Sequence, residues 1–302
     1  MTTDDTVRVP EDAFNGLPGF GFLPHYAELD GMRIAYLDEG PIDGPPVWFM
    51  HGEPTWSYLW RKVFPAVAAA GYRCIVPDLA GFGRSDKPTD VGWYSYDRHA
   101  GLMGALAEHL DLTGGTMVVH DWGGPIGMRL FVQQPERFER LVVLDTGLFT
   151  GEQPMTDAWR AFRDFVSRTE DLPIGFLVKG ACARGLEDDV AAAYEAPFPS
   201  VASKAGARAF PLMLPTSPQM DGAAAGRAVR DALAADHRPK LVLWADADPI
   251  IPVKAGVRLA ELINAPPPEL IQNASHFLQE DAGAQIGARI AQWLGAPTPS
   301  AA

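Results

Sequence analysis

Residues 118–130 read VVHDWGGPIGMRL. An apolar run leads into Asp121, two glycines follow Trp122, and an amphipathic stretch of helical length comes next. This is the layout of a nucleophile elbow, in which small residues beside the nucleophile allow the sharp strand-to-helix turn that exposes its side chain. Serine is the common nucleophile of such turns, and an aspartate stands in its place here. The stretch therefore predicts a strand, a tight turn and a helix that present the carboxylate of Asp121.

Short apolar runs bounded by turn residues lie on both sides of this elbow and predict a sheet. The runs in the middle of the chain are apolar on successive residues, as in strands that are covered on both faces. Amphipathic stretches of helical length, such as 98–111 and 124–134, separate several of them. We therefore expect a mostly parallel, doubly wound α/β sheet. The predicted strands are 33–39, 46–50, 73–77, 116–120, 141–145, 240–244 and 268–272.

The strand pattern is absent from residues 150–230, where Ala-rich, helix-forming segments are broken by PFP and PTSP. We interpret this stretch as a helical cap inserted into a core domain made of residues 1–149 and 231–302. Such an insertion lies over the carboxyl ends of the strands, where open α/β sheets bind ligands. The Ala/Pro-rich tail after residue 295 is predicted to be frayed. The predicted cap helices are 157–168, 188–195 and 201–208.

Composition excludes several classes of protein. The 302 residues carry a formal net charge of −13 and no run of Lys and Arg, which argues against nucleic acid as a partner. No apolar run approaches the roughly 18 residues of a membrane span, and the acidic N-terminal stretch lacks the apolar core of an export signal. Cys74 and Cys182 are far apart in the chain and suit a reduced cytoplasm. We expect a cytoplasmic protein without membrane contact, and nothing in the sequence indicates its oligomeric state.

An aspartate nucleophile favours alkyl transfer over acyl transfer. Attack by a carboxylate on an acyl group gives a mixed anhydride, whereas attack on an sp³ carbon with a leaving group gives a stable ester. The alternative is that Asp121 only caps the helix over 124–134, a common role for aspartate. The reactive role is favoured because the chain also supplies the groups that turnover of an ester requires.

Hydrolysis of such an ester needs water activated by a base, commonly a histidine that a carboxylate orients. His276 follows the last predicted strand, in QNASHFLQED, and WADADPIIP after strand 240–244 offers Asp246 and Asp248. The chain order Asp121, acid, His276 is typical of the triads on this kind of sheet. We expect His276 to be the base and one of the two aspartates to be its partner.

The loop after strand 46–50 reads HGEPTWSYLW, residues 51–60. Its His-Gly pair is typical of a loop that completes an oxyanion hole, so we expect the backbone N–H groups of Glu53 and Trp122 to be the two donors. The sequence contains no metal-ligand cluster and no phosphate-binding glycine motif. No metal and no organic cofactor are expected.

Four segments together resemble the haloalkane dehalogenases, a family with the α/β-hydrolase fold. They are HGEPTWSYLWR (51–61), VPDLAGFGRSDKP (76–88), VVHDWGGPIG (118–127) and the stretch around His276. The likeness covers nearly the whole chain. HGEPTWSYLWR and HDWGG are specific together, whereas the pattern at 76–88 is shared with epoxide hydrolases.

The resemblance implies hydrolytic dehalogenation by way of a covalent alkyl ester on Asp121. Water activated by His276 then releases a primary alcohol, with halide and a proton as the other products. The family aspartate stands directly before a Pro-Ile step, which favours Asp248 over Asp246. The implied partners are a small apolar halogenated substrate, water and the halide ion.

The resemblance also implies that two tryptophans hold the departing halide through their indole N–H groups. Trp122 matches the first, and Trp159, in the cap segment TDAWRAF, is the choice for the second. Core packing on an amphipathic helix is the alternative for Trp159. Glu53 stands where another branch of the family has an Asn that donates to halide, and an ionised carboxylate cannot donate.

Three other interpretations use the same nucleophile or the same fold. An epoxide hydrolase needs lid tyrosines to protonate the epoxide oxygen, and residues 150–230 contain one tyrosine, Tyr194. A fluoroacetate-type dehalogenase would have an arginine directly after the nucleophile, where this chain has Trp122. A cofactor-free oxygenase or a ligand receptor on this fold is the alternative from a different class, since fold does not dictate function.

Overall fold

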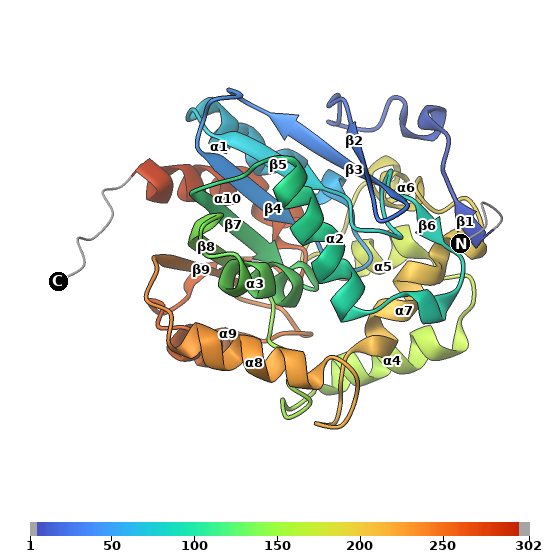
Figure 1. Ribbon diagram of the computed structural model, residues 1–302. Helices are drawn as coiled ribbons and strands as arrows, with labels where there is room; N and C mark the ends of the chain where they lie inside the picture. Colours follow the sequence, from blue (N-terminus) through green and yellow to red (C-terminus); the bar gives the residue numbers. More distant parts are fainter. Residues whose placement is uncertain (1–4, 296–302) are drawn as a thin grey trace.

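An eight-stranded sheet forms the centre of the computed structural model, which describes residues 5–295 (Figure 1). The strand order is β10-β9-β8-β7-β4-β5-β3-β2, and only the pairs β2–β3 and β3–β5 are antiparallel. A separate two-stranded pair joins β1 to β6. The strands are β1 (Thr6–Val7), β2 (His25–Leu29), β3 (Met32–Glu39), β4 (Pro46–Met50), β5 (Arg73–Pro77), β6 (Lys87–Pro88), β7 (Gly115–His120), β8 (Phe138–Leu144), β9 (Lys240–Ala245) and β10 (Glu269–Ile271).

Helices cover the sheet on both faces, which confirms the predicted doubly wound α/β architecture. In Figure 1, α2 (Tyr96–His109) and α3 (Gly123–Gln133) lie in front of the sheet, and α3 packs against α8 (Ala223–Ala234). On the other face, α1 (Phe64–Ala69) packs against α10 (Leu278–Gly295). The strands β4, β7, β8 and β9 are almost wholly buried between these layers, as their continuous apolar sequences require.

Residues 150–230 contain helices and no strand. The helices α4 (Asp157–Arg168) and α7 (Ala205–Met213) pack against each other, as do α5 (Ile174–Gly180) and α6 (Asp188–Glu195). The predicted boundary at residue 230 falls inside α8, which contacts α3 and α9 (Val253–Leu262) of the sheet layer. The division into core and cap remains a prediction.

The predicted elements agree with the structure except at short or mixed segments. Each predicted strand is present with its ends shifted by no more than three residues, but β2 was not predicted, because HYAEL mixes charged and apolar residues. The predicted helix over 201–208 is a short 3₁₀ turn followed by α7, which extends to Met213. The tail after residue 295 lies outside the described residues.

Parallel pairing brings the ends of four strands to one edge of the sheet. Strands β4, β7, β8 and β9 pair in parallel in that order, so the residues that follow them meet at their carboxyl ends. Asp121 follows β7, Asp145 follows β8, and Asp248 lies in the loop after β9. This edge is where the candidate site lies.

Among the described residues, no helix combines the length and the apolar character needed to cross a bilayer.

Candidate active site

Asp121 occupies a sharp turn between β7 and α3. Its backbone has a φ of 47°, in the left-handed region that residues other than glycine seldom adopt. The turn leaves no room for side chains at the two glycines after Trp122, because a Cβ on Gly123 would lie 2.3 Å from the Met50 carbonyl oxygen and one on Gly124 1.8 Å from Thr146 Oγ1. The glycines of HDWGG are therefore required by the packing of this elbow.

The backbone and side chain of Asp121 are both fixed by hydrogen bonds. Its N–H donates to the Asp145 carbonyl oxygen at 3.2 Å, and its own carbonyl oxygen accepts from the Thr146 hydroxyl. The Glu53 N–H donates to Oδ1 at 2.7 Å. Burial raises the pKa of Asp121, but the hydrogen bond and charge of His276 and the backbone N–H of Trp122 outweigh it, so the pKa lies below its usual value. The carboxylate is ionised, and its Oδ2 atom is left for chemistry.

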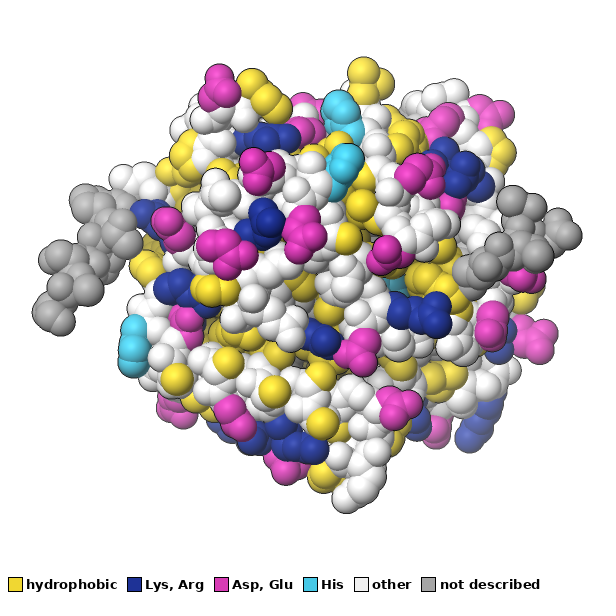
Figure 2. Space-filling model, viewed as in Figure 1, with side chains coloured by type: hydrophobic (Ala, Val, Ile, Leu, Met, Phe, Trp, Pro, Cys, Tyr) yellow, Lys and Arg dark blue, Asp and Glu magenta, His cyan; other side chains and the backbone are white. Residues whose placement is uncertain are grey.

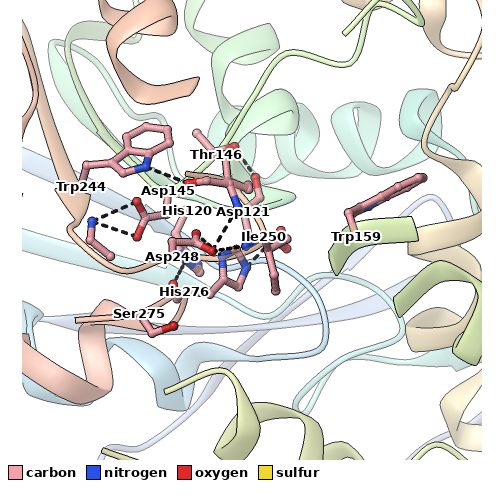
Figure 3. A network of polar contacts seen from close by, with 12 residues as sticks. His120, Asp121, Asp145, Thr146, Trp159, Trp244, Asp248, Ile250, Ser275 and His276 are labelled. Atoms are coloured by element: carbon pink, nitrogen blue, oxygen red, sulfur yellow. Dashed lines mark hydrogen bonds and ion pairs between the residues drawn. The ribbon is translucent and has the colours of Figure 1, made fainter. Parts of the chain in front are cut away.

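His276 lies between two carboxylates (Figure 3). Its Nδ1 is 2.8 Å from Asp248 Oδ2, and its Nε2 is 3.6 Å from Asp121 Oδ2. Burial disfavours the charged ring, but the negative charges of Asp248 and Asp121 outweigh that cost and raise the pKa of His276 well above its usual value. The two neighbouring carboxylates therefore favour the protonated imidazole in the free protein.

The two aspartates of the loop after β9 make different contacts. Asp248 is buried; its Oδ2 contacts His276, while its Oδ1 accepts from the N–H groups of Ile250 and Ile251 at 2.7 and 3.0 Å. Asp246 is exposed and accepts from the backbone of the loop that carries His276. Asp248, and not Asp246, is thus the aspartate in contact with the imidazole ring.

The Glu53 side chain is buried beside Asp121. Burial raises its pKa well above the usual value, and the negative charge of Asp121 adds to the effect. Its Oε1 atom has no hydrogen-bond partner among the described residues. An ionised Glu53 side chain could not donate a hydrogen bond, whereas the raised pKa favours the neutral carboxyl group, which can.

A cavity of about 850 Å³ opens onto Asp121 and His276. Trp122 and Trp159 both line this cavity, although Trp122 comes from the turn before α3 and Trp159 from α4. The Trp122 ring is held edge-on by Phe149 and Phe210, at centroid distances of 4.8 and 5.0 Å. Trp159 lies in the first turn of α4, where its N–H donates to the capping Thr156 hydroxyl at 3.1 Å, and Figure 3 shows its ring apart from the polar network.

Two buried residues of this site were assigned no role from the sequence. Asp145 was predicted as the last residue of a strand, but it follows β8 with a φ of 25°, and its carboxyl group accepts from the Ala245 N–H. Burial raises its pKa well above the usual value, with the charge of Asp248 adding to it. His120 contacts the carbonyl oxygen of His276 through Nε2 at 2.8 Å. Its pKa is lowered to about 4 by burial and by the charge of His276, so it is neutral and donates there.

His120 and Asp145 stand at the ends of β7 and β8, and both strands lead to the same edge of the sheet. These positions are the signal in the sequence from which the two residues could have been found. Within residues 5–295, no group of three or more His, Cys, Asp and Glu side chains is arranged to hold a metal ion.

The fold and the site together define an α/β hydrolase, and a profile described as "alpha/beta hydrolase fold" matches residues 45–283. A haloalkane dehalogenase of Mycobacterium marinum is 41% identical over 296 residues, covering 96% of this chain and 99% of its own. One from Psychrobacter cryohalolentis is 38% identical, covering 95% and 97%. The tetrameric haloalkane dehalogenase DpaA from Paraglaciecola agarilytica superposes with a TM-score of 0.89 at 34% identity, covering 97% of this chain and 99% of its own. The chain belongs to the haloalkane dehalogenase family, which confirms the resemblance found in the sequence.

Proposed function

We propose that this protein hydrolyses haloalkanes to a primary alcohol, halide and a proton through a covalent ester on Asp121. The observation that carries the proposal is the lining of one cavity. An ionised aspartate at an elbow, a histidine with its own carboxylate, and two indoles from separate segments all face the same space. Membership of the haloalkane dehalogenase family supports the same chemistry.

In the first step, Asp121 Oδ2 attacks the carbon that bears the halogen. Oδ1 is the oxygen held by the Glu53 N–H, which leaves Oδ2 as the nucleophile. The carbon–oxygen bond forms as the carbon–halogen bond breaks, and the electron pair leaves with the halide. The indole N–H groups of Trp122 and Trp159, both of which line the cavity, donate to that anion. Such charge-directed bonds are strong in a cavity with little water.

In the second step, His276 takes a proton from water, and the oxygen of that water attacks the ester carbonyl carbon, Cγ of Asp121. The negative charge of the intermediate develops on Oδ1, where the N–H groups of Glu53 and Trp122 stabilise it. Collapse of the intermediate expels the alkoxide, which takes the proton of the newly formed carboxylic acid and leaves as the alcohol. The carboxylate of Asp121 is thereby restored, and the proton that His276 took from water is released to solvent during turnover. Asp248 holds the imidazole in the orientation that presents Nε2 to the water.

The cavity favours small apolar substrates. Its wall is built mainly from apolar residues of the sheet loops and of α4, α5 and α9, and Asp121 and His276 are among its polar groups. We propose that residues 150–230 act as the cap over this cavity and that 1–149 and 231–302 form the core. Both cysteines are free thiols, and we propose a cytoplasmic location on that basis.

Epoxide hydrolysis is disfavoured by the position of the single cap tyrosine. Tyr194 is fully buried, donates its hydroxyl hydrogen to Glu280 Oε1, and does not line the cavity. No tyrosine lines this cavity in the described part of the chain, so none is placed to protonate an epoxide oxygen.

Halide release tests the proposed function directly. Purified protein is incubated with 1-bromobutane or 1,2-dibromoethane, and bromide and acid are measured, with styrene oxide as the parallel substrate. We expect bromide and protons in equal amounts and no diol. Diol formation without halide release over a broad panel of haloalkanes would identify an epoxide hydrolase, and turnover of neither class would favour a receptor or an oxygenase on this fold.

A further inference from the structure

The loop that carries His276 is held in place mainly through its backbone. The ring of His276 contacts Asp248, and its carbonyl oxygen accepts from His120. The residues on either side are also fixed: the Ser275 N–H donates to Asp281 Oδ2 at 3.0 Å, and the Phe277 N–H donates to the Ala181 carbonyl oxygen at 3.4 Å. The position of the imidazole therefore depends on partners outside the triad.

One of these partners also holds the segment after α5. Asp281 Oδ2 accepts from the Ala183 N–H at 2.9 Å, and its Oδ1 accepts from the Arg184 N–H at 3.3 Å. These donors are separated from Asp281 by 98 and 97 residues of sequence and lie in the region 150–230. A single carboxylate thus joins the histidine loop to the cap region, through hydrogen bonds that its charge strengthens.

The residue before Asp281 makes a second connection between the same two regions. Glu280 is buried; it accepts from the Tyr194 hydroxyl of α6 and pairs with Arg61 and Lys62 of the core. The helix kinks directly after Asp281, since Ala282 has a non-helical φ of −143°. The first turn of α10 is therefore fixed by contacts on the cap side and on the histidine side, separately from the rest of the helix.

Asp121 does not depend on these contacts. Its backbone is fixed by Asp145 and Thr146, and its Oδ1 by the Glu53 N–H. A disturbance at Asp281 would therefore reach the base and leave the nucleophile in place. In the proposed reaction, Asp121 serves the alkylation step and His276 serves the hydrolysis of the ester.

We propose that Asp281 is a positioning residue that sets His276 for ester hydrolysis and makes that position depend on the docking of the cap segment 181–184. The inference rests on the proposed function, because it concerns the second step of that reaction. Misplacement of a reacting group by about 1 Å can cost on the order of 100-fold in rate. Loss of the shared carboxylate should accordingly slow hydrolysis while alkylation of Asp121 continues.

Asp281→Asn and Asp281→Ala are the test variants. Asparagine has nearly the same shape but lacks one acceptor oxygen and the charge, so it keeps the test valid if the alanine variant does not fold. The matched control is Arg289→Gln, which removes the ion pair between the same helix and Glu269 on β10 without touching residues 275–281. Melting temperatures of all variants report on general destabilisation.

Rapid-quench single turnovers with 1-bromobutane separate the two steps, because intact mass counts the alkylated protein at each time. For Asp281→Asn we expect alkylation within about twofold of wild type, hydrolysis slower by about tenfold or more, and alkyl-enzyme as the main steady-state species. Arg289→Gln should match wild type in both steps. Unchanged hydrolysis, or equal slowing of both steps, would overturn the inference. If the wild-type protein releases no halide or is not alkylated at Asp121, the proposed function itself fails.

Discussion

His276 Nε2 lies 3.6 Å from Asp121 Oδ2, while its Nδ1 lies 2.8 Å from Asp248 Oδ2. The histidine therefore stands between two negative charges in a buried site, and these charges raise its pKa against the opposing effect of burial. A base that is already protonated cannot activate water. Alkylation resolves this conflict, because it turns Asp121 into a neutral ester and removes one of the two charges.

The pH dependence of the two steps should therefore differ. Alkylation uses the ionised Asp121 and does not need a neutral histidine, so its rate should change little between about pH 5 and about pH 9. Hydrolysis should slow as the pH falls, since His276 in the alkyl-enzyme gains a proton below its pKa. Single-turnover rates at each pH measure both steps. A parallel loss of both rates with one common pKa would show that the histidine serves alkylation as well.

Glu53→Gln tests the neutral state of the buried carboxyl group. A carboxyl group whose pKa is raised in the folded protein contributes stability that is complete below its unfolded pKa and is lost as the pH rises towards the folded pKa. Glutamine removes that loss, so the melting temperature of the variant relative to wild type should rise between about pH 5 and about pH 8, by about 2 °C or more.

The control for this prediction is Glu108→Gln on the exposed side of α2, which should show no such trend. Turnover by Glu53→Gln should stay within about threefold of wild type, because the backbone N–H donor is unchanged. A variant that loses most of its activity, with no pH-dependent gain in stability, would mean that Glu53 works as an ionised carboxylate.

Replacement of either cavity tryptophan by phenylalanine should weaken halide stabilisation. Trp122→Phe and Trp159→Phe each remove one indole N–H, and we expect alkylation to slow on the order of 10-fold to 100-fold. The rate of ester hydrolysis should fall less than the rate of alkylation. Quenching of fluorescence by bromide measures halide binding, with Trp293→Phe as control, since Trp293 does not line the cavity. Normal bromide binding by Trp159→Phe would assign that residue to packing alone.

Gly124→Ala should destabilise the protein strongly. A Cβ at this position would lie 1.8 Å from Thr146 Oγ1, whose hydroxyl fixes the backbone of Asp121. We expect a loss of about 2 kcal/mol or more in the free energy of unfolding. Gly101→Ala in α2 is the matched control, because nothing lies within 4 Å of its added Cβ, and it should stabilise by about 0.5–1 kcal/mol. Similar stabilities for the two variants, measured by urea unfolding, would contradict this account of the elbow.

The sequence predicted those parts of the fold and site that depend on local pattern. Continuous apolar runs identify β4, β7, β8 and β9, and the glycines after Trp122 identify the elbow, because both are consequences of burial and backbone shape within a few residues. Asp121 and His276 could be found in this way, since each follows a strand whose end lies at the same edge of the sheet.

Other features depend on contacts between distant segments and leave no local signal. The raised pKa of Glu53 follows from burial beside Asp121, which the sequence does not reveal. Asp281 takes its partners from residues 183 and 184, nearly one hundred positions away, and nothing in QNASHFLQED distinguishes it from a surface acid. Asp145 was missed because its strand was extended by one residue, which hid its position at the strand end.

The covalent ester on Asp121 is the central claim, and His276→Phe tests it most directly. This variant lacks the base, so alkylation should proceed and hydrolysis should stop. After incubation with 1-bromobutane, intact mass spectrometry should show protein heavier by one butyl group, and peptide mapping should locate the group on Asp121, while Asp121→Asn should remain unlabelled. An unmodified His276→Phe protein, or a label on another residue, would contradict the account.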